Sequence, residues 1–180
     1  DVNALAGTEK WADTVATFTK YAKLFAENGM CLGYHNHDFE FMKLNGKYAL
    51  DILYEEVSAD LLQTELDTCW VNVGGENPAD YIRKYAGRTS FLHLKDFVGG
   101  KSENMYALIG IDENQKKDTI GEFEFRPVGH GCQDVVAVVE AGIEAGAKWF
   151  VVEQDRWYDR CPLEAARMSI ETLKKIGLKG

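Results

Sequence analysis

The feature that most constrains this chain is a repeated alternation of helix-like and strand-like segments. Apolar residues recur at helical spacing over 8–29, and a short apolar run follows directly after Asn28-Gly29. This order repeats along the chain. The four strand-like runs, each after a helical pattern, are 30–37, 62–67, 90–96 and 149–153. Because parallel strands need a crossover between them, this order predicts a parallel α/β fold with about four strands.

One stretch breaks this alternation. The segment from Phe97 to Gly131 is rich in glycine, carries mixed charge and shows no clear helical or strand period. Loops of this length are often functional. We therefore expect a long excursion between the third strand and the helix that begins near Asp134.

The composition excludes several classes of protein. No apolar run approaches the ~20 residues that a membrane-spanning helix needs. With 29 acidic and 20 basic residues the net charge is -9, which argues against binding to nucleic acid or to anionic membranes. The cysteines are scattered without a Cys-x-x-Cys pair, which is typical of reduced thiols in a cytoplasmic protein.

Polar side chains lie at or near the end of each predicted strand. They are His35, Asp67, His93 and Glu153. Reacting groups of parallel α/β folds gather where the carboxyl ends of the strands meet, so these four should lie together. Such a mixed set of nitrogen and oxygen donors suits one divalent ion of Mn, Mg, Co or Zn.

Simpler explanations exist for each of these residues taken singly. Asp67 could form a turn, Glu153 could cap a helix, and His93 could be a hydrogen-bonded core residue. His35 and His37 share one strand face because side chains alternate. One of them is expected to bind the metal and the other to contact substrate, but the pattern does not choose between them.

Lys95 lies two residues after His93 and therefore on the same face. A cation there could polarise a carbonyl group or stabilise an enolate, and a salt bridge to Asp96 or a neighbour is the simpler alternative. Trp70 follows a strand end, where an aromatic face could stack on a sugar or pack in the core. His130 lies between two glycines that either let the backbone approach a ligand or form a tight turn.

These motifs together resemble a known family. The segments 33–41, 66–70, 93–96, 127–131 and 152–155 are similar to the sugar phosphate isomerase/epimerase family of the xylose-isomerase-like TIM barrel superfamily. The resemblance runs from about residue 8 to residue 177. It implies parallel (β/α) units of TIM-barrel type, with the four strands forming the C-terminal half of a (β/α)8 barrel. It also implies that substrate contacts come from His37, Trp70, His130 and Asp155.

The resemblance implies a metal held by a Glu, an Asp, a His and a Glu at the ends of barrel strands five to eight. Asp67, His93 and Glu153 match the last three positions, and His35 stands where the epimerases have the first Glu. That departure removes the family's two-glutamate mechanism. His35 would then serve as ligand or base, or the chemistry would be a one-base elimination as in the dehydratases.

The resemblance therefore implies a metal-dependent sugar isomerase or epimerase that removes a proton beside a carbonyl. Glu153 would be the base, with Lys95 or His37 stabilising the developing negative charge. A dehydratase or lyase acting on a keto-sugar or inosose is the alternative. An inactive half-barrel that binds sugar or metal without turnover is the alternative from another class.

Length is the second departure from the family. A TIM barrel needs at least ~200 residues, and this chain has 180. We expect a single half-barrel domain over 1–180, either truncated at its N-terminus or completed by oligomerisation. Because an isolated half would expose strand edges, a homodimer or higher oligomer is expected.

Overall fold

A four-stranded parallel sheet forms the centre of the protein. The computed structural model describes residues 6–101 and 123–179. The strands are β1 (Leu32–His35), β4 (Leu62–Asp67), β5 (Thr89–Leu94) and β8 (Trp149–Val152). They pair in parallel in the order β1-β4-β5-β8, which is their order along the chain. The predicted α/β fold with four parallel strands is confirmed.

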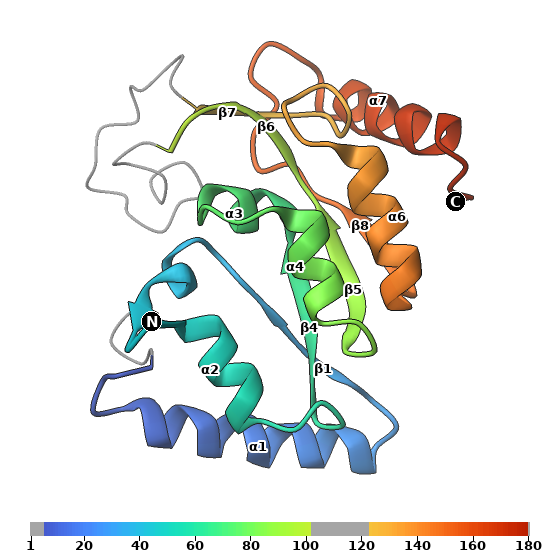
Figure 1. Ribbon diagram of the computed structural model, residues 1–180. Coiled ribbons are helices and arrows are strands. Elements are labelled where there is room, and N and C mark those ends of the chain that lie inside the picture. The colour runs from blue at the N-terminus through green and yellow to red at the C-terminus, as the bar shows by residue number, and fades with distance from the viewer. Residues whose placement is uncertain (1–5, 102–122, 180) are drawn as a thin grey trace.

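Helices precede, connect and follow these strands along the chain. They are α1 (Trp11–Glu27), α2 (Ala49–Glu56), α4 (Pro78–Lys84), α6 (Val135–Ala145) and α7 (Pro162–Lys175). In Figure 1, α2, α4 and α6 lie in front of the sheet, and α7 lies beyond β8. Side chains of Asn77 and Asp134 cap α4 and α6 by accepting backbone N–H groups. None of the helices in the described ranges is long and apolar enough to cross a membrane.

The two faces of the sheet differ in their surroundings. Leu62, Leu66 and Leu92 point to the helix-covered face and are completely buried. On β8 the alternate residues Trp149 and Val151 remain 63% and 40% exposed. Because side chains alternate along a strand, the second face of the sheet is uncovered. This is the arrangement of half a barrel, with helices outside and the inner face open.

The excursion predicted between Phe97 and Gly131 has strand structure at both ends. Strand β6 (Asp96–Gly99) pairs antiparallel with β7 (Phe123–Arg126). The middle of that stretch lies outside the described residues. Phe97, Phe123 and Phe125 are buried in a second apolar cluster with Cys69 and Trp70. Sequence periodicity did not predict the pairing because both strands are short and far apart in the chain.

Short elements also follow β1 and β4. After β1 come a 3-10 turn, η2 (Phe39–Phe41), and a small hairpin of β2 (Lys43–Leu44) and β3 (Lys47–Tyr48). Helix α3 (Thr68–Val73) begins directly after β4. Both segments lie at the carboxyl ends of their strands, where they surround the predicted site.

A buried arginine just before β5 joins the start of β4 to the end of α2. Arg88 is 8% exposed, and its Nε donates to the carbonyl oxygen of Leu62 at 2.8 Å. Its guanidinium also donates to the carbonyl oxygens of Tyr54 and Val57 at the end of α2. We expect Arg88→Met to lower the free energy of unfolding by about 3 kcal/mol, because buried carbonyl groups would lose charged donors. Urea denaturation measures the change.

Arg83→Met is the matched control for this prediction. Arg83 forms an exposed ion pair with Glu144 at 2.7 Å, a type of contact that contributes little to stability. Its urea midpoint should stay close to that of the unmodified protein. Equal midpoints for the two variants would show that the Arg88 contacts do not stabilise the fold.

Candidate metal centre

The register of the sheet brings the four predicted ligand positions together. Asp67 at the end of β4 lies opposite His93 on β5. That pairing depends on a register shift between Thr64 and Glu65, without which Asp67 would lie opposite Leu92. His35 on β1 pairs with Glu65, so its side chain points to the same uncovered face. Glu153 follows directly after β8.

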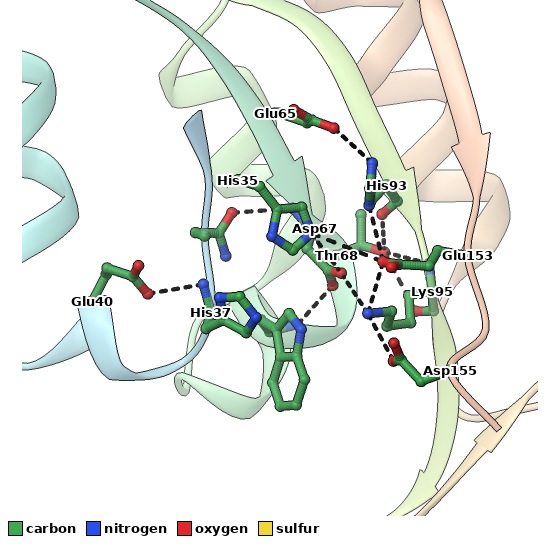
Figure 2. A network of polar contacts seen from close by, with 12 residues as sticks. His35, His37, Glu40, Glu65, Asp67, Thr68, His93, Lys95, Glu153 and Asp155 are labelled. Atoms are coloured by element: carbon green, nitrogen blue, oxygen red, sulfur yellow. Dashed lines mark hydrogen bonds and ion pairs between the residues drawn. The ribbon is translucent and has the colours of Figure 1, made fainter. Parts of the chain in front are cut away.

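His35, Asp67, His93 and Glu153 form a compact group that could hold a metal ion. Each offers one ligand atom, and these atoms all lie within 4.8 Å of one another. His35 Nε2 is 3.3 Å from Asp67 Oδ2 and 3.9 Å from Glu153 Oε2. Figure 2 shows the side chains pointing toward one another from separate strands. His35, and not His37, is the first-strand histidine in this group.

Asp67 uses its two carboxylate oxygens differently. Oδ1 caps α3 by accepting the backbone N–H of Trp70 at 3.0 Å, while the Asp67 N–H donates to Asn36 Oδ1. Oδ2 is buried and has no hydrogen-bond partner among the described residues, and the same is true of His35 Nε2. These two atoms lie 3.3 Å apart, and the ammonium of Lys95 lies 3.2 Å from Oδ2, so Oδ2 faces a position that suits a cation. Asp67 thus both caps a helix and faces the group.

Lys95 places an ammonium group among the site carboxylates. Its Nζ lies 3.2 Å from Asp67, 2.8 Å from Glu153 and 3.0 Å from Asp155, and the residue is 3% exposed. Burial lowers the pKa of Lys95, but these three carboxylates outweigh that effect and raise the pKa above its usual value. Lys95 is therefore protonated at neutral pH. Of the simpler alternative, a salt bridge to Asp96 or a neighbour, the structure shows ion pairs with the neighbouring carboxylates.

Glu153 is held in its ionised form. The hydrogen bond with His93 Nδ1, 3.0 Å from Glu153 Oε2, has the largest effect on the pKa of Glu153 and lowers it. Burial raises this pKa and Lys95 lowers it further, so that the pKa is about 2. Burial lowers the pKa of His93, while the contact with Glu153 and the nearby carboxylates raise it to a net value above normal. A carboxylate that is ionised at neutral pH can accept a proton.

His37 lies beside the group without joining it. Its ring stacks on Phe39 with centroids 5.4 Å apart, and it contacts Trp70 and His35 at 5.5 and 5.1 Å. Burial, and then the charge of His35, lowers the pKa of His37 to about 4, so the ring is neutral at neutral pH. Glu40 fixes this segment by accepting the His37 backbone N–H at 2.8 Å.

The three remaining predicted substrate contacts lie in different surroundings. Asp155 pairs with Lys95 at the edge of the group. Trp70 is fully buried and packs edge-on against Phe125, so its ring lies in the second apolar cluster and not on an open surface. His130 is exposed, and within the described parts of the chain it has no hydrogen bond or ion pair to the group. Substrate contact by these residues stays a prediction.

The glycines around His130 allow a close approach of the backbone to a carboxylate. The N–H groups of Gly129 and Gly131 donate to Asp96 Oδ2 at 2.9 and 2.8 Å. A Cβ atom on Gly131 would lie 2.2 Å from Asp96 Oδ1. Of the two predicted uses of this motif, the structure shows a tight turn bound to Asp96.

Two residues near the group are absent from the sequence predictions. Glu65 Oε1 lies 2.7 Å from His93 Nε2, and Asn36, which follows His35 at the end of β1, is completely buried. Strand alternation carried a signal for Glu65, which lies two residues before Asp67 and therefore on its face. No pattern distinguished Asn36 from an ordinary loop residue.

Parallel β/α units with nitrogen and oxygen donors at the carboxyl edge define a protein of the TIM-barrel class. The family model for the xylose isomerase-like TIM barrel matches residues 3–176. The chain belongs to this family, as the motifs predicted.

Individual relatives agree with the family assignment. The chain is 27% identical over 154 residues to an inosose dehydratase of Clostridium beijerinckii, covering 82% of this chain and 48% of that protein. An inosose dehydratase of Geobacillus kaustophilus is 26% identical over 148 residues, covering 82% and 46%. The chain thus spans about half the length of the curated relatives it matches.

A solved structure supports the fold. A sugar phosphate isomerase/epimerase from Parabacteroides distasonis superposes with a TM-score of 0.67 at 20% identity, covering 89% of this chain and 50% of that one.

Proposed function

We propose that this chain carries the catalytic half of a divalent-metal-dependent enzyme that removes a proton beside the carbonyl of a sugar or inosose. The observation that supports it is the convergence of His35, Asp67, His93 and Glu153, whose ligand atoms all lie within 4.8 Å of one another. These four side chains would hold one Mn, Mg, Co or Zn ion. When bound, the metal would polarise the substrate's carbonyl and hydroxyl oxygens.

The protonation states of the residues around the group fit this chemistry. Glu153 is ionised and lies at the open edge of the sheet, so it is our candidate for the base. Lys95 stays protonated and therefore supplies positive charge near the developing enolate instead of acting as a second base. His37, neutral and beside the group, would contact substrate without adding charge.

Among reactions of this type, dehydration is favoured over epimerisation. Epimerisation needs two opposed acid/base groups, and His35 stands where the epimerases place a glutamate. The curated relatives are named inosose dehydratases. In a one-base elimination, Glu153 takes the proton beside the carbonyl and returns it to the hydroxyl on the next carbon. The C–O bond of that hydroxyl breaks and water leaves, with a new C=C bond in the product.

An assay in deuterated water tests this proposal. Mn²⁺-loaded protein is incubated with an inosose and, separately, with ketoses, and the products are analysed by mass spectrometry and NMR. We expect water loss from the inosose without formation of an epimer. Deuterium incorporation with epimer formation would favour the isomerase or epimerase reaction. Bound metal without either change would support a half-barrel that binds without turnover.

The uncovered face of the sheet supports a proposal about assembly. Trp149 and Val151 are exposed on the side that forms the interior of a complete barrel. A groove of about 420 Å³ lies between β8 and α7, and Phe150 and Val152 line it from the other face of β8. Covering such a face stabilises it, so we propose a homodimer or higher oligomer of the 180-residue chain.

A further inference from the structure

Glu65 contacts the candidate metal group without being one of its four members. It lies on β4 two residues before Asp67, on the same face of the strand. Its Oε1 is 2.7 Å from His93 Nε2. Glu65 is therefore a second carboxylate in contact with one predicted ligand.

The two ring nitrogens of His93 face different partners. Nδ1 is 3.0 Å from Glu153 Oε2, inside the group of four, while Nε2 faces Glu65 outside it. Figure 2 shows the ring held between these two carboxylates, which come from different strands. Since only one nitrogen can face the group, Nδ1 is the atom available to a metal.

The neighbouring strand leaves space for Glu65. Gly33 lies on β1 on the same uncovered face, and a Cβ atom there would come within 3.3 Å of Glu65 Oε2. That distance is shorter than nearly all such contacts, so a larger residue at position 33 would push against the carboxylate. The sequence of β1 thus accommodates the glutamate in its present position.

A metal-bound histidine uses the lone pair of one nitrogen and keeps a proton on the other. When that N–H donates to a carboxylate, the hydrogen bond fixes the tautomer and ring orientation and makes the ligand more basic. Loss of such a partner typically weakens metal affinity by about 10- to 100-fold. The 2.7 Å between Glu65 Oε1 and His93 Nε2 is within the distance that such a hydrogen bond needs.

We infer that Glu65 is a positioning residue that accepts the Nε2–H of His93 and so directs Nδ1 to the metal. The inference rests on the proposed function, because it assumes that the group of four binds a metal ion. It gives a role to a charged residue on the barrel's inner face that is neither base nor ligand.

Glu65→Leu and Glu65→Gln test the inference, with Zn²⁺ as the probe. Gln63→Leu is the control, because Gln63 lies on the same strand face but bonds to Ala59 and Ser90. Zn²⁺ affinity should fall about 10- to 100-fold in Glu65→Leu, and less in Glu65→Gln, whose amide oxygen still accepts a hydrogen bond. Gln63→Leu should leave the affinity unchanged.

Nitrogen-15 NMR of the Zn²⁺-loaded protein gives a readout that a merely structural role would not change. We expect His93 to be metal-bound through Nδ1, with an Nε2–H signal that exchanges slowly in the unmodified protein and quickly in Glu65→Leu. Metal bound at Nε2 would overturn the role of Glu65 but not the metal site. Equal Zn²⁺ affinity and equal Nε2–H exchange in the two proteins would do the same. No Zn²⁺ binding by the unmodified protein would overturn the metal site itself, and the inference with it.

Discussion

Replacing Glu153 with glutamine should lower the rate of proton abstraction by about 100- to 10,000-fold, the usual contribution of a general base. Glutamine has nearly the same size but cannot take up a proton. In the structure, Glu153 is the ionised carboxylate at the open edge of the group, 36% exposed and within reach of a substrate. Deuterium exchange or water loss, followed by NMR under saturating Mn²⁺, measures the rate.

Glu144→Gln serves as the control for this prediction. Glu144 is an exposed glutamate on α6 that pairs with Arg83 and is not a member of the group. Its substitution removes the same charge without touching the site and should leave the rate unchanged. Turnover by Glu153→Gln at the rate of the control would exclude Glu153 as the base.

The second large effect is expected from Lys95→Met. In the absence of metal, the ammonium of Lys95 is the cation that holds Asp67, Glu153 and Asp155 near one another. Removing one partner of a buried ion pair leaves uncompensated charge and typically costs 3–5 kcal/mol. We expect a loss of about 3 kcal/mol in the free energy of unfolding, since Glu153 and Asp155 remain partly exposed to water.

A divalent ion should reverse much of this loss. Lys95 and a bound cation would share the oxygen atoms Asp67 Oδ2 and Glu153 Oε2, so removing the lysine removes a competitor for the metal. Binding to the folded state alone stabilises it in proportion to the logarithm of ligand concentration over Kd. Mn²⁺ should therefore raise the midpoint of thermal unfolding more in Lys95→Met than in the unmodified protein.

Lys47→Met provides the comparison. Lys47 forms an exposed pair with Glu55 at 2.7 Å and lies in the small hairpin away from the carboxylates. Its substitution should change neither stability nor the response to Mn²⁺. If Lys95→Met and Lys47→Met unfold at the same temperature with and without Mn²⁺, Lys95 does not compensate the site carboxylates.

The sequence carried most of the information about where the ligand atoms would lie. Apolar runs ending in His35, Asp67, His93 and Glu153 located the strand ends, and parallel pairing requires those ends to share one edge. The exact partners depended on the register shift before Glu65, which no periodicity reveals. Strand alternation likewise left His35 and His37 equivalent, because the pattern extends the strand to residue 37, whereas β1 ends at His35.

Other parts of the fold depended on contacts between distant segments. The pairing of β6 with β7 joins residues whose local pattern resembles a loop, so it could not be predicted from either segment alone. Trp70 was ambiguous because an aromatic residue after a strand serves a sugar or a core equally well. Trp70 packs against Phe125, which lies far along the chain, and this contact places its ring in the core.

Metal content per chain tests the central claim most directly. The unmodified protein and an Asp67→Ala, His93→Ala double variant are dialysed against Mn²⁺ and analysed for bound metal and protein. One ion per chain in the unmodified protein, and none in a double variant that remains folded by circular dichroism, is the predicted result. A folded, unmodified protein that takes up no Mn²⁺, or a double variant that keeps it, would contradict the assignment of this group as the metal centre.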